Sequence, residues 1–281
     1  MVGSESTLEN KLDCKEGETM LIKAHGIQMN YELTGKKDAS IVMLSHSLGS
    51  SLLMWNPQMK PLEPHFQVLR YDIRGHGGSE TPPGPYTLEM LGEDAIGLLD
   101  ALSIDKVQWV GLSLGGMIGQ SVALNYPKRL RSLVLSDTAA AIAPEAQSIW
   151  EERIDAIREK GVESQLEPTM ERWFTPSFLR QNPPMFEVIR KQFLTTTAQG
   201  YLGCIEAIRK LNYLDQLSEI KIPTLILVGE DDPGTPVAAS EAMHKKISNS
   251  KLVIIKSARH LSNIEQPEAF NATLLTFLKS L

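Results

Sequence analysis

The sequence predicts an α/β protein: a mostly parallel sheet flanked by helices, with a helical cap inserted after the sixth strand. Two observations carry this prediction. Short apolar runs alternate with amphipathic helical patterns up to residue 136, and such an order is typical of parallel sheets covered on both faces. From Ala139 to about Asp215 the sequence is helical in pattern, with no strand-like run, and strand signals return only afterwards.

The individual elements follow from apolar runs and breaking residues. The segments expected as strands are 20–24, 27–33, 41–45, 67–71, 107–110, 130–136, 224–228 and 252–255. A helix is expected over 87–102, where apolar residues recur on one face, and another over 113–126, which ends before Pro127. We therefore expect a core formed by 20–138 and 216–281, with a cap formed by 139–215.

Composition and charge exclude several classes of protein. The chain has 281 residues, 42% of them hydrophobic, which suits one large domain with an insertion. A net charge of −6 without a basic stripe argues against nucleic acid as a partner. No apolar stretch approaches the roughly 18 residues that span a bilayer.

The N-terminus and the cysteines indicate the compartment. Residues 1–19 are polar and acidic and lack the apolar core of a signal peptide, so we expect a mobile N-terminal extension. Cys14 and Cys204 lie far apart and form neither a disulfide framework nor a metal-ligand spacing. Reduced cysteines and a cytoplasmic location are expected.

The pentapeptide Gly111-Leu112-Ser113-Leu114-Gly115 follows an apolar run and is typical of a strand that turns sharply into a helix. Such a turn needs small residues two positions either side of the serine, because the strand and helix backbones pass close together. The serine hydroxyl is then exposed at a helix N-terminus, where backbone N–H groups can stabilise an oxyanion. Ser113 is therefore the candidate nucleophile.

A serine nucleophile needs a histidine base, and the chain has six histidines. His260 follows the last expected strand, at the carboxyl end where parallel sheets carry their ligand-binding and active sites, and it is our candidate for the base. His46 directly follows the third expected strand, beside the expected oxyanion donors, and is a candidate substrate contact. His76 lies in a tight loop and is expected to be structural. Solvated positions are expected for the others: His25, His65 and His244.

The orienting acid is expected in the turn Gly229-Glu230-Asp231-Asp232-Pro233, which ends an apolar strand and precedes a helix. Asp232 is our choice and Asp231 its near alternative. Asp137, at the end of the segment 130–136, is a rival from another strand end. The resulting order, Ser113, Asp232, His260, is the order expected when an elbow serine works at the top of such a sheet.

The oxyanion donors are expected from two backbone amides. The Leu114 amide follows the nucleophile, and the Leu48 amide lies in the small-residue loop His46-Ser47-Leu48-Gly49-Ser50-Ser51. Losing one such donor typically costs ~3–4 kcal/mol of transition-state stabilisation.

The chain resembles the α/β-hydrolase superfamily over nearly all of 20–281. The resemblance rests on Ser45-His46-Ser47-Leu48-Gly49, Tyr71-Asp72-Ile73-Arg74-Gly75-His76-Gly77, the elbow, and Gly229-x-x-Asp232. More narrowly it resembles the 3-oxoadipate enol-lactonase group, through Met54-Trp55, Gly84-Pro85-Tyr86-Thr87, Arg172-Trp173-Phe174-Thr175 and His260-Leu261-Ser262-Asn263-Ile264-Glu265-Gln266-Pro267.

The resemblance implies hydrolysis of a carboxylic ester or lactone without a cofactor, with Ser113, Asp232 and His260 as the triad. The chain departs from the group in its extension before Met20 and in having His46 where the group often has asparagine. A serine at the elbow excludes relatives that need a carboxylate there, such as haloalkane dehalogenases, and those that need a cysteine, such as dienelactone hydrolases.

The substrate is expected to be a small molecule bound under the cap. Trp173 is a candidate for lining the pocket, and Arg172 for pairing with the carboxylate of an enol-lactone. Arg153, Arg180 and Arg190 are open alternatives to Arg172. Other activities on the same triad are a promiscuous carboxylesterase or another lactonase, acting on acyl-homoserine lactones or pyrethroid-like esters. A ligand receptor on the same fold is a further alternative.

Overall fold

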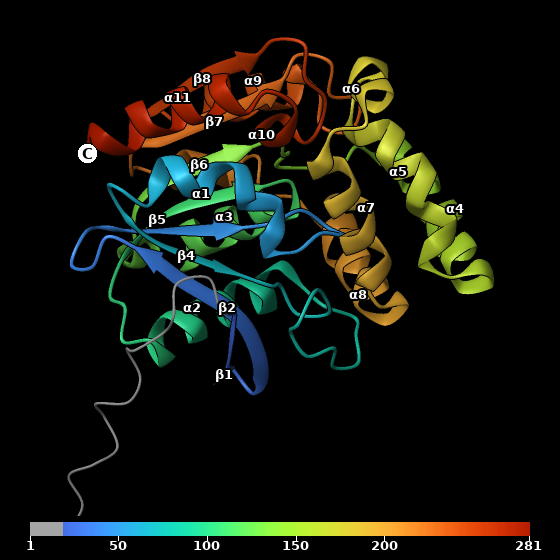
Figure 1. Ribbon diagram of the computed structural model, residues 1–281, viewed down its shortest axis with the longest axis horizontal. Coiled ribbons are helices and arrows are strands. Elements are labelled where there is room, and N and C mark those ends of the chain that lie inside the picture. Colours follow the sequence, from blue (N-terminus) through green and yellow to red (C-terminus); the bar gives the residue numbers. More distant parts are fainter. Residues whose placement is uncertain (1–18) are drawn as a thin grey trace, which may run out of the picture.

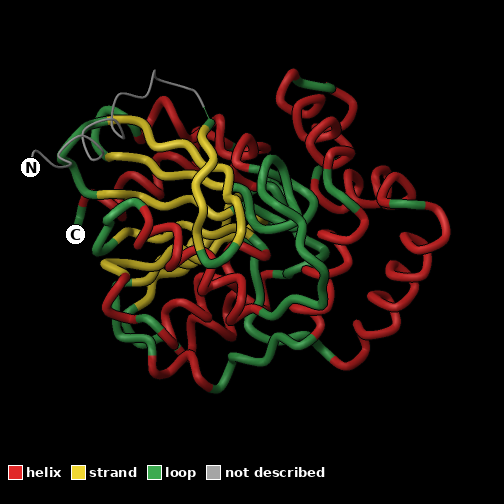
Figure 2. Tube along the Cα trace, turned by 90° about the horizontal axis from the view of Figure 1, so that it is seen from below, coloured by secondary structure: helices red, strands yellow, loops and turns green. Residues whose placement is uncertain are grey.

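The computed structural model describes residues 19–281, and within them eight strands form one twisted sheet (Figures 1 and 2). The strands are β1 (Met20–Ala24), β2 (Ile27–Gly35), β3 (Ile41–Ser45), β4 (Gln67–Tyr71), β5 (Val107–Leu112), β6 (Leu130–Ser136), β7 (Thr224–Gly229) and β8 (Ser250–Ile255). β2 pairs antiparallel with β1 and β4, and every other pairing is parallel. The mostly parallel sheet predicted from the sequence is confirmed.

The strands differ from the prediction only at their ends. β5 runs on to Leu112, so that the strand leads directly into Ser113. β8 begins two residues earlier than expected, at Ser250, because it is an edge strand and half-exposed polar residues can stand in it. The inner strands β5 and β7 are buried along their whole length.

The strand order is β1-β2-β4-β3-β5-β6-β7-β8, so the chain reverses direction across the sheet at β3. After β3 the chain forms β4 on one side of β3, and it then crosses over to form β5 on the other side of β3. In parallel sheets, ligands bind outside the carboxyl ends of the strands at such a reversal. The loops after β3 and β5 meet there, and the ends of β6, β7 and β8 continue the same edge.

Helices cover both faces of the sheet (Figure 2). On one face α2 packs against α3, and on the other α1 packs against α11. The bounds are α1 (Asn56–Leu62), α2 (Leu88–Ala101), α3 (Leu114–Asn125), α9 (Val237–Lys246), α10 (Ser262–Glu265) and α11 (Pro267–Lys279). α2 starts one residue after the predicted 87, because Thr87 is its N-cap and its side chain accepts a hydrogen bond from the Met90 N–H.

The segment between β6 and β7, here called the insertion, forms α4 (Gln147–Lys160), α5 (Leu166–Trp173), α6 (Pro176–Gln181), α7 (Pro184–Thr195) and α8 (Ala198–Arg209). It lies at one end of the sheet (Figures 1 and 2). Its two ends are joined where the Tyr213 N–H donates to the Ala140 carbonyl at 2.7 Å. Glycines allow close contact with the core, since a Cβ on Gly200 would lie 2.2 Å from the Gly75 carbonyl oxygen.

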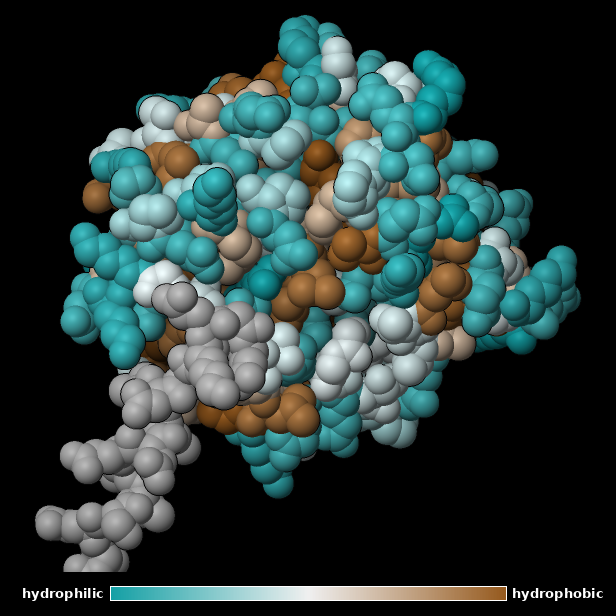
Figure 3. All heavy atoms as spheres, in the orientation of Figure 1, coloured by the Kyte–Doolittle hydropathy of each residue, from teal (hydrophilic) through white to brown (hydrophobic). Residues whose placement is uncertain are grey.

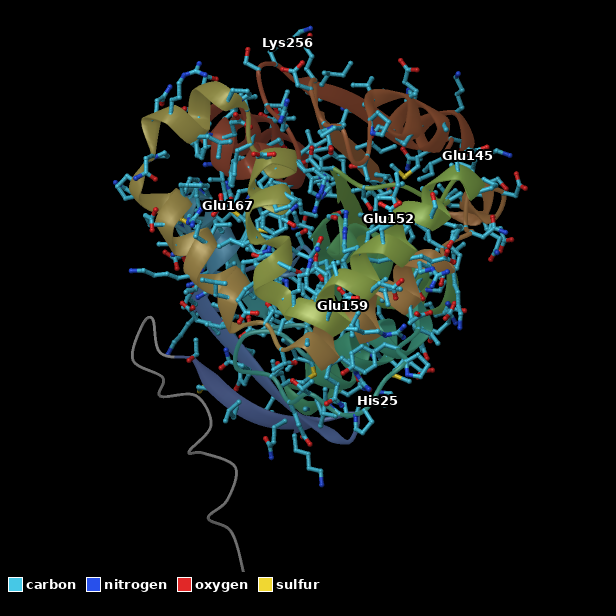
Figure 4. The ribbon with its side chains drawn as sticks, turned by 90° about the vertical axis from the view of Figure 1, so that its right-hand side faces the viewer. His25, Glu145, Glu152, Glu159, Glu167 and Lys256 are labelled. Carbon is cyan, nitrogen blue, oxygen red and sulfur yellow. The ribbon has the colours of Figure 1, made fainter. Side chains whose placement is uncertain are left out.

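Polar residues dominate the visible surface. The face shown in Figure 3 is mostly hydrophilic, with hydrophobic residues between the polar ones. Figure 4 looks onto the insertion, where Glu152 and Glu159 are exposed on the outer side of α4. Within residues 19–281 no helix is both long and apolar enough to cross a membrane. Cys204 is a buried free thiol, whereas Cys14 and nearly all of the expected extension lie outside the described residues.

Candidate active site

Ser113 stands at a sharp turn between β5 and α3. Its backbone is in the left-handed region, with φ 56° and ψ −116°, which is unfavourable for any residue with a side chain. The flanking glycines leave no room for a Cβ: on Gly111 it would lie 2.1 Å from the Gly115 carbonyl oxygen, and on Gly115 it would lie 2.1 Å from that of Ser45. Within the described chain, no hydrogen bond occupies the Ser113 hydroxyl, which is left available for a substrate.

Two backbone amides lie beside the elbow without acceptors. Leu114 is the first residue of α3, where N–H groups have no partner within the helix. The N–H of Leu48 in the loop after β3 and that of Leu114 donate to no residue among 19–281. The Gly115 N–H donates to the His46 carbonyl at 3.1 Å, which ties this loop to the elbow. The geometry suits an oxyanion hole.

Two buried histidines hold the loop that contains Leu48. His76 Nε2 accepts the Gly49 N–H at 2.9 Å, and His46 Nε2 accepts the Ile73 N–H at 2.9 Å. His46 Nδ1 donates to the Ser47 carbonyl at 2.7 Å, so both of its ring nitrogens are occupied by backbone groups. Burial lowers the pKa of His46 to about 4 and keeps the ring neutral. Both polar atoms of the His46 ring thus support the loop that contains Leu48, and a contact of His46 with the substrate stays a prediction.

His260 and Asp232 form a hydrogen-bonded pair. His260 Nδ1 donates to Asp232 Oδ2 at 2.8 Å, which leaves Nε2 unprotonated and, within residues 19–281, without a hydrogen-bond partner. The Thr235 hydroxyl donates to the same oxygen at 2.6 Å, while the N–H groups of Gly234 and Thr235 donate to Oδ1. Burial disfavours the imidazolium, but the charge and hydrogen bond of Asp232 outweigh it and raise the pKa of His260.

The two alternative acids have other surroundings. Asp231 is exposed, and Asp137 accepts hydrogen bonds from the Gly229 N–H and from the hydroxyls of Ser136 and Ser262. Neither makes a hydrogen bond to His260. Of the three candidates, Asp232 alone is bonded to the imidazole.

Trp173 and Arg172 stand at the end of α5, beside the histidine. The Trp173 carbonyl accepts the Leu261 N–H at 3.2 Å, and the Trp173 ring is buried edge-on against Phe193. The partly buried Arg172 guanidinium hydrogen-bonds Thr169 at 2.7 Å. Among the described residues no carboxylate forms an ion pair with it.

The three alternative arginines of the insertion are less suited to an anionic substrate. Arg190 is paired with Glu167 at 2.7 Å, Arg153 lies over the Trp150 ring, and Arg180 is exposed. Arg172 is also close enough to His260 to affect its pKa: besides burial and the nearby carboxylates, the charge of Arg172 acts on the pKa of His260, which it lowers.

Sequence reasoning missed residues that link the insertion to the histidine. Glu265 is buried, and its carboxylate accepts the Thr175 N–H and the Arg259 N–H, each at 2.9 Å, and the Thr175 hydroxyl. The only signal was Ser262-x-x-Glu265, a pattern also typical of a helix cap. No group of three or more His, Cys, Asp or Glu within residues 19–281 is arranged to hold a metal ion.

The chain matches known hydrolases over most of its length. Residues 40–267 match the family model described as alpha/beta hydrolase fold. The chain is 37% identical to 3-oxoadipate enol-lactonase 2 of Acinetobacter baylyi, over 92% of this chain and 96% of the relative, and 34% identical to 3-oxoadipate enol-lactonase 1 of the same organism, over 93% and 97%. It is 36% identical to the crystal structure of an enol-lactonase from Burkholderia xenovorans, with a TM-score of 0.89, over 92% of this chain and 100% of that one.

With this match and this geometry, the chain belongs to the α/β-hydrolase superfamily and is a hydrolase.

Proposed function

We propose that this protein hydrolyses a carboxylated lactone, such as 3-oxoadipate enol-lactone, through an acyl-enzyme on Ser113. One observation carries the choice of substrate. Arg172 has a partly buried guanidinium that acts on the pKa of His260, and among the described residues no carboxylate pairs with it. Partial burial of a cation without a counter-ion is unfavourable, so the site favours a ligand that brings a carboxylate. The similarity to 3-oxoadipate enol-lactonases supports the same class of substrate.

The proposed chemistry follows from the positions of the polar groups. His260 Nε2 takes the proton of Ser113 as its Oγ attacks the lactone carbonyl, and Asp232 stabilises the imidazolium. The Leu48 and Leu114 amides bind the oxyanion. Ring opening leaves the leaving group attached to the acyl chain. Water activated by His260 then releases the acid and restores the serine.

The insertion supplies the rest of the proposed site. We assign residues 139–215 as a cap over the active site, with Trp173 in its wall and Arg172 as the carboxylate anchor. Burial, and then the charge of Arg153, lower the pKa of Arg172 to about 10, so it is still protonated at neutral pH. A bound carboxylate neutralises the charge that opposes imidazolium formation, which couples substrate binding to activation of the base.

The proposal is tested with the purified enzyme on 3-oxoadipate enol-lactone, the methyl ester of that lactone, an acyl-homoserine lactone and a p-nitrophenyl ester. Ser113→Ala is expected to abolish hydrolysis of every substrate. Arg172→Met is expected to lower kcat/KM for the carboxylated lactone by about 10- to 100-fold, the loss of one charge-assisted hydrogen-bonded contact, and far less for the uncharged esters.

Arg190→Met is the matched control, because Arg190 already has Glu167 as its partner. Equal losses on charged and uncharged substrates would exclude Arg172 as the carboxylate anchor. Faster hydrolysis of the p-nitrophenyl ester or the acyl-homoserine lactone than of the carboxylated lactone would point to an esterase or to another lactonase. Ligand binding with negligible turnover would point to a receptor.

A further inference from the structure

A second carboxyl group lies behind the catalytic pair, where β6 ends. Asp137 is fully buried and directly follows β6, whose neighbours in the sheet are the strands before the serine and the acid. Its Oδ1 accepts the Gly229 N–H at 2.7 Å. Its Oδ2 accepts the hydroxyls of Ser262 at 2.6 Å and Ser136 at 2.8 Å. The proposed chemistry makes no use of this group.

These contacts join the two turns that carry the acid and the base. Gly229 is the last residue of β7, three positions before Asp232, and Ser262 is the first residue of α10, two positions after His260. Asp137 therefore holds both turns to one strand end. Its backbone has φ 43°, in the left-handed region, which aspartate and asparagine adopt more readily than most residues.

The carboxyl of Asp137 also contributes to the electrostatics of the histidine. Burial, and then the charge of Asp232, raise the pKa of Asp137 to about 7, against the opposing effect of His260. In turn, after burial and Asp232, the carboxyl of Asp137 raises the pKa of His260, while Arg172 on the insertion lowers it. Where Asp137 is ionised, the imidazolium is thus stabilised by two carboxylates and opposed by one guanidinium.

We propose that Asp137 is a positioning residue of the catalytic centre, which ties the turns bearing Asp232 and His260 to the end of β6 and helps Asp232 to stabilise the protonated imidazole. The inference rests on the proposed function, in which His260 is the general base. It assigns to Asp137 a role distinct from that of the triad acid, since the imidazole hydrogen bond goes to Asp232. A purely structural carboxyl would affect folding but not the ionisation of His260.

The test measures kcat and kcat/KM of Asp137→Asn from about pH 5 to 9, with an uncharged p-nitrophenyl ester so that Arg172 has no carboxylate to bind. Asparagine keeps an acceptor for the Gly229 N–H, and its amide can donate to the two hydroxyls. We expect kcat to fall about tenfold and the acid limb of the profile to move to lower pH, because the imidazolium loses one of its two carboxyl partners. Asp231→Asn, at the exposed neighbouring acid, is expected to retain the wild-type profile.

A second variant covers the case in which Asp137→Asn does not fold. Ser262→Ala removes one donor to Asp137 without changing any charge, and we expect a lower kcat with KM retained. A wild-type profile and kcat in Asp137→Asn overturn the proposal, as does a loss of thermal stability alone. If Asp137→Asn does not fold, an unchanged kcat in Ser262→Ala overturns it.

Ser113→Ala separates this inference from the proposed function. If Ser113→Ala retains hydrolysis, the proposed function fails. If it abolishes hydrolysis while Asp137→Asn keeps the wild-type profile, only the role of Asp137 fails.

Discussion

Asp232→Asn tests the assignment of the triad acid most directly. Oδ1 of Asp232 accepts the N–H groups of Gly234 and Thr235 at 2.8 and 3.1 Å, whereas Oδ2 faces His260 Nδ1 at 2.8 Å. The backbone donors will hold the asparagine oxygen at the first position, so the amide nitrogen must face the imidazole. The histidine then carries its proton on Nε2, where it cannot act as a base toward Ser113.

The size of the effect follows from these contacts. Losing a hydrogen bond to the charged imidazolium removes about 1.5–3 kcal/mol, and the cost of restoring the active tautomer adds to it. A total of roughly 3–5 kcal/mol corresponds to a 10²- to 10⁴-fold loss of kcat. Because the Asp232 carboxylate raises the pKa of His260, the remaining activity is expected to extend to lower pH.

The assay compares kcat on a p-nitrophenyl ester for Asp232→Asn, Asp137→Asn and Asp231→Asn, each checked for folding by circular dichroism. Asp231→Asn is the control, since this exposed side chain has no role in the mechanism. A larger loss in Asp137→Asn than in Asp232→Asn would refute the reasoning and move the triad acid to the end of β6.

Two further predictions concern the groups that support the site. Burial lowers the pKa of His46 to about 4 from 6.5, so below pH 6.5 the unfolded chain binds a proton that the folded one does not, and by pH 5 this costs about 2 kcal/mol of stability. Urea unfolding at pH 7 and pH 5 is expected to show that His46→Asn loses less stability between the two pH values than the wild type does. An equal loss in the two proteins would contradict this prediction. Glu265→Gln leaves the N–H of Thr175 or Arg259 without its acceptor, at a cost of about 1–3 kcal/mol, and is expected to lower the Tm by several degrees and to raise KM. The exposed Glu268→Gln is its control, and an unchanged Tm in Glu265→Gln would show that the bridge does not contribute.

The sheet and the elbow could be predicted because their signals are local. An apolar run bounded by breaking residues forms a strand wherever both faces are covered, and the structure has a strand at every predicted position. The glycines around Ser113 are needed because the backbone of Gly111 passes close to that of Gly115, only four positions later. The expected order of nucleophile, acid and base follows from the order of the strands that carry them.

Long-range contacts decided what the sequence left open. The sequence offered Asp137, Asp231 and Asp232 as acids on one rim, and the distance between Asp232 and His260, which are 28 positions apart, separates them. In the sequence, Arg172 was one of four equal candidates for the carboxylate anchor, and only its burial and its lack of an ion pair among the described residues distinguish it. His46 looked like a substrate contact because the residue before the oxyanion loop is close to the site. In the structure its two ring nitrogens bond instead to the backbone of Ser47 and Ile73.

The sequence by itself determined the α/β architecture and singled out a candidate nucleophile, because both depend on residues close together in the chain. Only the tertiary structure decided which charged groups face one another, because the energy of a charge depends on its burial and on partners from distant segments. The Ser113 elbow could therefore be read from five residues. The surroundings of His260, in contrast, needed β6, β7, β8 and the insertion to be assembled.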